Sequence, residues 1–262
     1  MSEHSDIGIS TGAYADLQLA AALARIADLA PAAEIYSSGA HSLLERNNAL
    51  AVADAGLPFS VHGPFTHDGL GNPFEPDRRA AVKLHRRHMK VASRLGATLY
   101  IVHPDLLARP SPRNPEIVGA LERSFADLRA IQDDLGLPVA VENMAEGDSS
   151  HFTAPGDLDL QGLGVVLDAG HAALTGTLSA WLADPQARLL HVHLHDNLGV
   201  GEMDLHLPLG SGTIDIAPVI EVARAAGASM IFELTSEADV ISSLDHLRAR
   251  DLLLNDDAGV SR

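Results

Sequence analysis

The sequence of 262 residues contains no cysteine. This absence excludes disulfides, thiolate nucleophiles, iron–sulfur clusters and every zinc site built from cysteine. Long apolar segments are also missing, since no run approaches the roughly 20 residues that cross a bilayer. The first six residues are polar and acidic, so we expect neither a membrane helix nor a secretion signal, and we expect a cytoplasmic protein.

Basic side chains are scarce. Eighteen lysines and arginines stand against 35 acidic residues, which gives a formal net charge of −17. Affinity for nucleic acids and anionic membranes depends on a cationic surface, so the composition favours a small-molecule substrate and no membrane partner. The net charge alone does not exclude DNA, because the charge at the docking surface decides that binding. The sequence does not indicate the oligomeric state.

Histidine, in contrast, is abundant, with 14 residues. Because thiols are absent, a transition-metal site must use imidazole and carboxylate ligands, which suit zinc, manganese, cobalt or iron. We expect a divalent metal, zinc or manganese, as the cofactor.

Short apolar runs alternate with helical patterns along the chain. Four helical patterns end in glycine (Gly56, Gly96, Gly136 and Gly227) just before an apolar run, as expected for left-handed helix caps. The predicted strands are approximately Asp6–Ser10, Ala33–Ser37, Phe59–His62, Thr98–His103, Val139–Glu142, Gly164–Asp168, Leu190–His195 and Ser229–Leu234. The predicted helices include Leu17–Leu29, Leu43–Ala55, Asp77–Leu95, Glu116–Leu135, Ala217–Ala226 and Ala238–Arg250.

This alternation predicts an α/β fold, a (β/α)8 TIM barrel. Eight strand–helix units in about 250 residues match that fold in size, and most of the strands are continuously apolar, as parallel strands covered on both faces are. A doubly wound open sheet is the alternative, but no glycine-rich dinucleotide loop follows the first strand. We expect a single domain over residues 1–254 and a loose tail over 255–262.

Six consecutive predicted strands end in side chains that can bind a metal. These residues are His62, His103, Glu142, Asp168, His193 and Glu233, with His171, Asp204 and His206 close behind in the chain. In a closed barrel these strand ends meet at one face, where barrel active sites lie. One such histidine alone is more often a buried structural residue, and one glutamate could cap the next helix. Six together would repel each other unless cations held them, so the pattern predicts a metal site.

The seventh predicted strand carries three histidines at alternate positions, so their side chains share one face. We expect His193 to be the metal ligand and His191, one pair deeper, to belong to the core or to support the site. The role of His195 stays open. The loop Leu209–Thr213 could contact a phosphate through its backbone N–H groups, although such a loop is more often a simple turn.

Several of these motifs resemble the xylose-isomerase-like TIM-barrel superfamily, which includes the sugar phosphate isomerases and epimerases and endonuclease IV (AP endonuclease family 2). The motifs are Val61–Phe65, Val102–Pro104, Val141–Asn143, Asp168–His171, His193–Asp196, Asp204–Ile214 and Phe232–Leu234. They cover the chain from the third to the eighth predicted strand in the same order. The set is specific for the superfamily and less specific for the reaction.

The resemblance implies two different ligand sets. The isomerase and epimerase pattern implies one divalent ion held by Glu142, Asp168, His193 and Glu233, in which Glu142 and Glu233 are also the catalytic acid/base pair. The endonuclease IV pattern implies three zinc ions held by His62, His103, Glu142, Asp168, His171, His193, Asp204, His206 and Glu233. All nine of those positions are filled here.

We expect an isomerase or epimerase of a small sugar or sugar phosphate, with at least two ions per chain. The alternative is an endonuclease IV-like phosphoesterase or phosphodiesterase with a multinuclear zinc site, and a binding protein without catalysis is a third possibility. The complete ligand set favours the hydrolase. The loops Thr66–Glu75 and Asn197–Met203 contain no lysine or arginine, which weighs against DNA. One departure weakens the epimerase pattern, since Gly199 occupies the position of its substrate-binding arginine.

Overall fold

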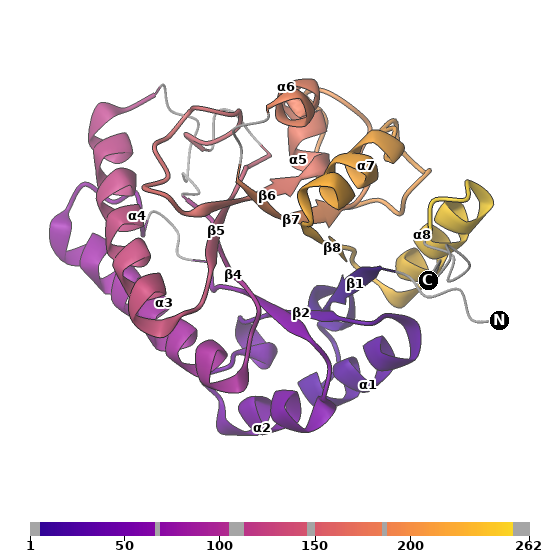
Figure 1. Cartoon of the computed structure of the whole chain (residues 1–262), viewed down its shortest axis with the longest axis horizontal. Helices are drawn as coiled ribbons and strands as arrows, with labels where there is room; N and C mark the ends of the chain where they lie inside the picture. Colours follow the sequence, from indigo (N-terminus) through magenta and orange to yellow (C-terminus); the bar gives the residue numbers. More distant parts are fainter. Residues whose placement is uncertain (1–5, 66–68, 105–112, 146–149, 185–187, 254–262) are drawn as a thin grey trace, which may run out of the picture.

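The computed structural model describes residues 6–65, 69–104, 113–145, 150–184 and 188–253. Its eight strands close into a parallel barrel in sequence order, and β1 pairs with β8 to complete the ring. Figure 1 shows the strands as an inner ring and the helices as an outer layer. The predicted TIM barrel is therefore confirmed. The expected tail, residues 255–262, lies outside the described residues.

The bounds of the elements agree closely with the alternation read from the sequence. The strands are β1 (Ile7–Ser10), β2 (Ala33–Tyr36), β3 (Phe59–His62), β4 (Tyr100–Val102), β5 (Val139–Glu142), β6 (Gly164–Asp168), β7 (Leu189–Leu194) and β8 (Ser229–Phe232). The α-helices are α1 (Leu19–Leu29), α2 (Arg46–Ala55), α3 (Glu75–Leu95), α4 (Pro115–Leu135), α5 (Ala169–Leu174), α6 (Leu178–Ala183), α7 (Ala217–Ala226) and α8 (Glu237–Ala249). Two 3-10 helices, η1 (Thr11–Tyr14) and η2 (Gly39–His41), follow β1 and β2.

Glycine sets the end of four of these helices. Gly56, Gly96, Gly136 and Gly227 follow α2, α3, α4 and α7 with φ between 64° and 84°. This left-handed conformation suits glycine because it has no Cβ. Each of these helices is followed by a strand, so the glycine caps lie where the chain returns to the amino-terminal end of the barrel.

Apolar side chains pack on both sides of the strands. The main core lies between the barrel and the helices and includes Ile9, Val61 and Val192. A separate small cluster of Leu99, Ile101, Ala140 and Val166 fills part of the barrel interior. Above it, the inward positions become polar towards the carboxyl ends of the strands, and this change creates the site.

None of the described helices is both long and apolar enough to cross a membrane.

Candidate metal centre

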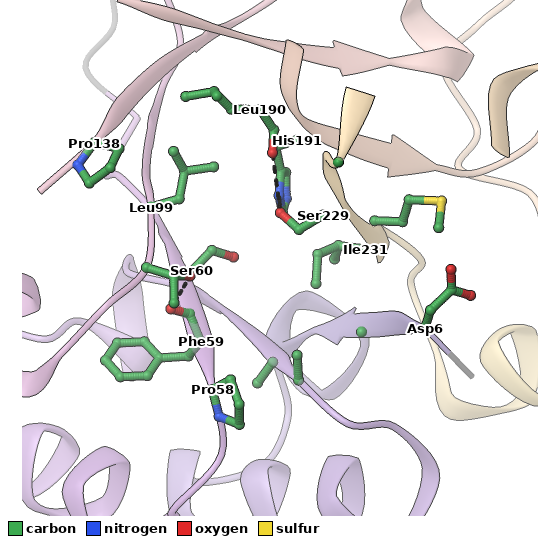
Figure 2. A pocket seen from close by; sticks show the side chains of 16 residues that line it. Asp6, Pro58, Phe59, Ser60, Leu99, Pro138, Leu190, His191, Ser229 and Ile231 are labelled. Carbon is green, nitrogen blue, oxygen red and sulfur yellow. Dashed lines mark hydrogen bonds between the residues drawn. The ribbon is translucent and has the colours of Figure 1, made fainter. Parts of the chain in front are cut away.

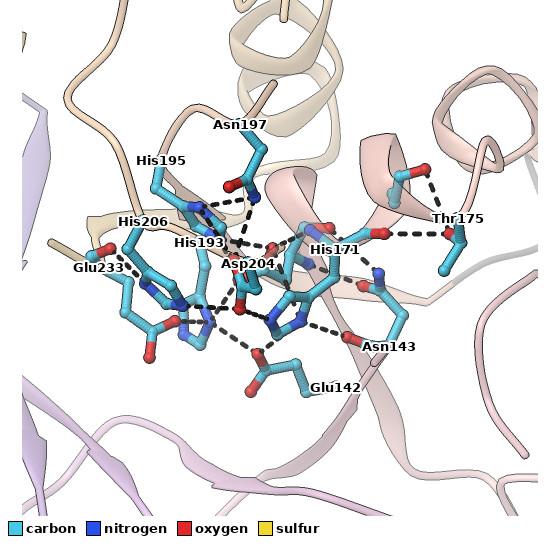
Figure 3. Close-up of polar contacts among 12 residues, drawn as sticks. Glu142, Asn143, His171, Thr175, His193, His195, Asn197, Asp204, His206 and Glu233 are labelled. Atoms are coloured by element: carbon cyan, nitrogen blue, oxygen red, sulfur yellow. Dashed lines mark hydrogen bonds and ion pairs between the residues drawn. The ribbon is translucent and has the colours of Figure 1, made fainter. Parts of the chain in front are cut away.

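The nine residues named as candidate ligands meet at the carboxyl-terminal mouth of the barrel. His62, Glu142 and Asp168 are the last residues of β3, β5 and β6, and Glu233 directly follows β8. Parallel strands bring these ends to one rim, as the sequence predicted. The nine fall into three neighbouring groups whose ligand atoms lie within 4.8 Å of one another. Figure 3 labels six of the nine, drawn together from β5, α5, β7 and the segments that follow β7 and β8.

The first group consists of His62, His103 and Glu142. The Nε2 atoms of the two histidines are 3.1 Å apart, and they lie 3.2 and 3.0 Å from Oε2 of Glu142. Ligands about 2.0–2.1 Å from a tetrahedral zinc ion lie about 3.4 Å from each other. The three atoms therefore have the spacing that one such ion requires after a small expansion.

The second group shares Glu142 with the first and adds Asp168, His193 and Glu233. Nδ1 of His193 is its centre, at 2.8 Å from Oε2 of Glu233, 3.2 Å from Oε1 of Glu142 and 3.6 Å from Oδ2 of Asp168. Glu142 ends β5 and Glu233 directly follows β8, and these two strands are not neighbours in the ring. Their carboxylates therefore reach the same imidazole nitrogen from different sides.

The third group consists of His171, Asp204 and His206, with His195 beside them. Oδ2 of Asp204 is 3.0 Å from Nε2 of both His171 and His206. His206 has a φ of 46°, a left-handed conformation that is costly for a residue with a Cβ. The strained backbone places its ring between Asp204 and the carbonyl of Glu233.

The hydrogen bonds of three histidines show why a cation fits between these side chains. Nδ1 of His62, His171 and His206 lies 3.0, 2.9 and 2.8 Å from the backbone carbonyl of Gly63, Asn143 and Glu233, respectively. Each Nδ1–H therefore donates to a carbonyl, and a neutral ring then presents a lone pair at Nε2. That lone pair faces a carboxylate oxygen, which is repulsive unless a proton or a metal ion lies between. Metal-binding histidines have this same arrangement of a carbonyl behind the ring.

Without a metal, protons must take that place. Burial alone would lower the pKa of His62, His171 and His206, but the carboxylates beside them outweigh it and raise the values to about 9, 10 and 9. Burial likewise opposes ionisation of Glu142 and Asp168, yet the imidazoles beside them hold their pKa well below the usual range. The centre is thus a dense set of opposite charges, in which divalent cations can take the place of the imidazole protons.

His195, whose role the sequence left open, contacts the carboxylate of Asp168. Its Nε2 lies 2.9 Å from Oδ1 of Asp168, and its Nδ1 faces the amide of Asn197 at 3.4 Å. The amide donates to Nδ1, so Nε2 carries the hydrogen and donates to the carboxylate. A Cβ on Gly170 would collide with this ring, and glycine at that position therefore makes room for His195.

Asp196 fixes the loop that carries Asp204 and His206. Its carboxylate accepts hydrogen bonds from the backbone N–H groups of Gly210, Gly212 and Ile214 at 2.9–3.0 Å. The N–H groups of Gly210 and Gly212 belong to the loop Leu209–Thr213, which the sequence offered as a phosphate contact. They are used inside the protein, so this segment is a turn that supports the site.

The sequence missed several residues that hold the centre. Asn143 bridges β5 and β6 through the backbone of Asp168, with Oδ1 accepting from its N–H and Nδ2 donating to its carbonyl. Asn197 donates to Oδ1 of Asp204 at 3.1 Å. Glu34 of β2 is fully buried beneath His193. Asn143 is the last residue of the motif Val141–Asn143 and Asn197 directly follows the motif His193–Asp196, whereas no sequence signal distinguished Glu34.

The family to which this architecture belongs is shown by comparison with known proteins. The model of the xylose isomerase-like TIM barrel matches residues 46–250. The chain belongs to the xylose isomerase-like TIM barrel family. The match spans most of the barrel, including all nine residues of the three groups.

Relatives of this xylose isomerase-like chain include an uncharacterized protein and a probable endonuclease. An uncharacterized protein of Methanocaldococcus jannaschii is 26% identical over 92% of this chain and 98% of its own length. A probable endonuclease 4 of Mycobacterium bovis is 28% identical over 73% of this chain and 79% of its own.

Solved structures share the barrel. The structure of a D-tagatose 3-epimerase-like protein is 24% identical with a TM-score of 0.78, and the match covers 94% of this chain and 97% of the other. A protein from Thermus thermophilus, studied after soaking with ZnCl2, is 26% identical with a TM-score of 0.67, covering 93% of this chain and 97% of the other. Members of this family bind divalent metals, and the three groups at the mouth of this barrel could bind them as well.

Proposed function

We propose that the protein is a metal-dependent isomerase or epimerase that acts on a small sugar or sugar phosphate. The observation that carries this proposal is the convergence of Glu142 and Glu233 on Nδ1 of His193, at 3.2 and 2.8 Å. Two carboxylates that approach one point from different sides of the barrel are suited to proton transfer on two faces of a substrate carbon.

Each residue has a defined part in this reaction. Divalent cations held by Glu142, Asp168, His193 and Glu233 would polarise the carbonyl and hydroxyl oxygens of the substrate and acidify the neighbouring C–H bond. One glutamate removes that proton and the other delivers a proton to the carbon. Burial opposes ionisation of both groups, but the positive imidazole of His193 lowers the pKa of Glu142 and Glu233. Both are therefore ionised at neutral pH, so either can act as the base, and the partner glutamate must take up a proton from water before it delivers one to the carbon.

The rim of the mouth favours a small substrate over a nucleic acid. The segment after β7 contains no lysine or arginine between Asn197 and Ile216. Its exposed side chains instead include Leu198, Val200 and Met203, which are 47%, 72% and 73% exposed. A duplex needs cations at the surface where it docks, and this surface offers apolar and acidic groups.

Aromatic rings form the wall on the opposite side. Phe65 packs edge-on against His103 with ring centroids 4.3 Å apart, and Tyr36 lies 5.9 Å from Phe65. Small-molecule sites commonly combine such apolar walls with a few polar groups. Gly199 has a φ of 115°, which disfavours the arginine that the epimerase pattern places there. The substrate oxygens must therefore be held by other groups of the site.

Phosphoester hydrolysis is the second candidate. It is favoured by the two further groups, one containing His62 and His103 and the other containing His171, Asp204 and His206, since a one-ion isomerase needs neither. Several ions in one cluster can activate a water and hold the leaving oxygen. This candidate fits a small phosphorylated substrate better than DNA because of the charge at the rim.

One experiment separates the two reactions. The metal-loaded protein is incubated in D2O with a panel of ketoses and their phosphates, and in parallel with an oligonucleotide that contains an abasic site. Proton transfer predicts deuterium at a substrate carbon in the NMR spectrum and an epimeric or isomeric product. Release of phosphate or nicking of the strand without deuterium incorporation would instead identify a hydrolase.

A matched pair of variants tests the catalytic glutamate. Glu233→Gln keeps the size of the side chain and should lower the rate at least about 100-fold, the usual contribution of a positioned acid or base. Glu221→Gln makes the same change at an exposed residue of α7 and should retain the full rate. Equal rates in the two variants would remove Glu233 from the reaction.

A further inference from the structure

Beneath the metal centre, the interior of the barrel contains a carboxylate that none of the predicted ligand sets includes. Glu34, in the middle of β2, is 0% exposed, as are His191 and His193 of β7. Its Oε1 lies 3.3 Å from Nε2 of His193, and its Oε2 lies 2.9 Å from Nε2 of His191. The strands β2 and β7 are not neighbours, so these side chains meet across the inside of the barrel.

His193 is oriented differently from three other histidines of the centre. The rings of His62, His171 and His206 turn Nδ1 to a backbone carbonyl and Nε2 to the site. His193 turns Nδ1 to the site and Nε2 to Glu34. Within the described residues, neither Nε2 of His193 nor Oε1 of Glu34 has a hydrogen-bond partner, and these two buried atoms face each other at 3.3 Å. The carboxylate thus occupies the place that a carbonyl has behind the other three rings.

We propose that Glu34 is a positioning residue that accepts the Nε2–H of His193 and thereby directs the Nδ1 lone pair at the cation held with Glu142, Asp168 and Glu233. A metal-binding histidine backed by a carboxylate has a fixed tautomer and a more basic ligand nitrogen than one backed by a carbonyl. The proposal rests on metal binding by the group of Glu142, Asp168, His193 and Glu233, and it adds the residue that orients His193, the central ligand.

The surroundings of Glu34 fix it in turn. Ser60, its partner in register on β3, donates from Oγ to Oε2 at 2.9 Å. His191 faces the same oxygen through Nε2, and its Nδ1 lies 2.6 Å from Oγ of Ser229. The hydroxyl of Ser229 also lies 3.4 Å from the carbonyl of Leu190, but its contact with Nδ1 is much shorter, and a hydroxyl that donates to Nδ1 leaves the ring hydrogen of His191 on Nε2, facing Glu34. Every polar neighbour of the carboxylate is thus a donor.

This row of side chains runs through the barrel to its amino-terminal end. A cavity of about 380 Å³ opens there, and its wall includes Ser60, His191 and Ser229. Figure 2 shows the hydrogen bond between His191 and Ser229 at the wall of this cavity, among apolar neighbours such as Leu99 and Pro138. Loss of the Glu34 side chain would leave buried donors unpaired next to a space that water can enter, so the test needs an isosteric substitution.

Glu34, His191 and His193 are also close enough to hold a further cation. Such an ion would need His193 to bind metals through both ring nitrogens and so to lose both ring hydrogens. Ser60 and His191 face Oε2 of Glu34 and His193 faces Oε1, so both oxygens of the carboxylate have a neighbour without an ion. We therefore argue for the positioning role, and the test below detects the ion if it exists.

The test compares metal affinity and ring tautomer in Glu34→Gln and in the exposed control Glu221→Gln. Glu34→Gln should weaken binding of one ion about 10- to 100-fold, as loss of such supporting groups does, and leave the remaining ions at wild-type affinity. Competition with a chromophoric chelator measures each step. Long-range 15N–1H NMR of the zinc-loaded wild type should show His193 with hydrogen on Nε2, and this signal should shift or broaden in Glu34→Gln only.

The outcomes separate this proposal from the proposed function. Wild-type affinity for every ion in Glu34→Gln, or a metal ion bound between Glu34 and His191, would overturn the positioning role. If Glu34→Gln does not fold, Ser60→Ala replaces it and should weaken the same ion about threefold through the lost hydrogen bond; unchanged affinity there would also overturn it. A protein that binds metal as expected but transfers no proton would refute the proposed reaction and leave Glu34 in its role.

Discussion

The most informative perturbation of this centre is the addition of zinc to the metal-free protein at pH 7. Four imidazoles of the site have a raised pKa in the absence of metal, because carboxylates surround them and outweigh the opposing effect of burial. They are His62, His171, His193 and His206. The pKa of His103 is lowered by burial, so this ring is already neutral. Zinc binds only the neutral imidazole, and the four protons must therefore leave.

The expected number of protons follows directly. With pKa values of about 9, 10 and 9 for His62, His171 and His206, these rings are almost fully protonated at pH 7, and His193 is as well. Saturation with zinc should release about four protons per chain. Four ordinary imidazoles with a pKa near 6.5 carry only about one proton between them at pH 7. The two accounts thus differ by about three protons.

Isothermal titration calorimetry measures this number when the same titration is repeated in buffers of different ionisation enthalpy. The account predicts that proton release falls as the pH is raised above 9, because the metal-free rings of His62 and His206 lose their protons there and that of His171 loses its proton near pH 10. Release of one proton or fewer at pH 7 would refute the reasoning, because the imidazoles would then be neutral before metal binds.

Three further predictions follow from the same contacts. The metal-free protein should lose several kcal/mol of stability as the pH rises through 9–10. The histidines with a raised pKa in the folded state stabilise the protein fully only below their unfolded pKa of about 6.5, and this stabilisation is lost as the pH rises through their folded values. Urea unfolding at pH 6.5, 8 and 10 measures the loss, and equal stability at the three values would contradict it. Asp196→Ala should lower the free energy of unfolding by about 4 kcal/mol, because the buried N–H of Asn197 and the partly buried N–H groups of Gly210, Gly212 and Ile214 lose their acceptor. A change below about 1 kcal/mol would show that water replaces the carboxylate. Gly170→Ala should lower the free energy of unfolding by about 1–3 kcal/mol, because the added methyl group displaces the ring of His195. Thermal unfolding measures this change, and a midpoint equal to that of the wild type would show that the ring can move aside.

Much of the fold could be predicted because the signals are local. Glycine caps and continuous apolar runs fixed the positions of the strands, and the bounds predicted for β3, β5 and β6 match those of the structure. The meeting of the strand ends followed from the closed parallel barrel alone. Two short helices, α5 and α6, were not among the helices given by range, because six residues are too few to show a helical period.

The supporting residues could not be predicted because they depend on pairing across the barrel. Glu34 stands between Ala33 and Ile35 in a four-residue strand, and only the register with Ser60 and the position of β7 show that it points at His193. The role of His195 depends on which of its nitrogens carries hydrogen, and this is set by Asn197 and Asp168. Sequence patterns identify candidate ligands, but the tautomers of imidazoles are set by contacts in space.

The central claim is that cations bind between the side chains of the three groups at the carboxyl-terminal mouth. Anomalous diffraction at the zinc absorption edge, on crystals of the zinc-loaded protein, tests it most directly. The account predicts at least two peaks, one of them beside Nδ1 of His193 and the others next to Nε2 of His62 or of His171. A map without peaks at this mouth, or with zinc bound only elsewhere on the protein, would contradict the account.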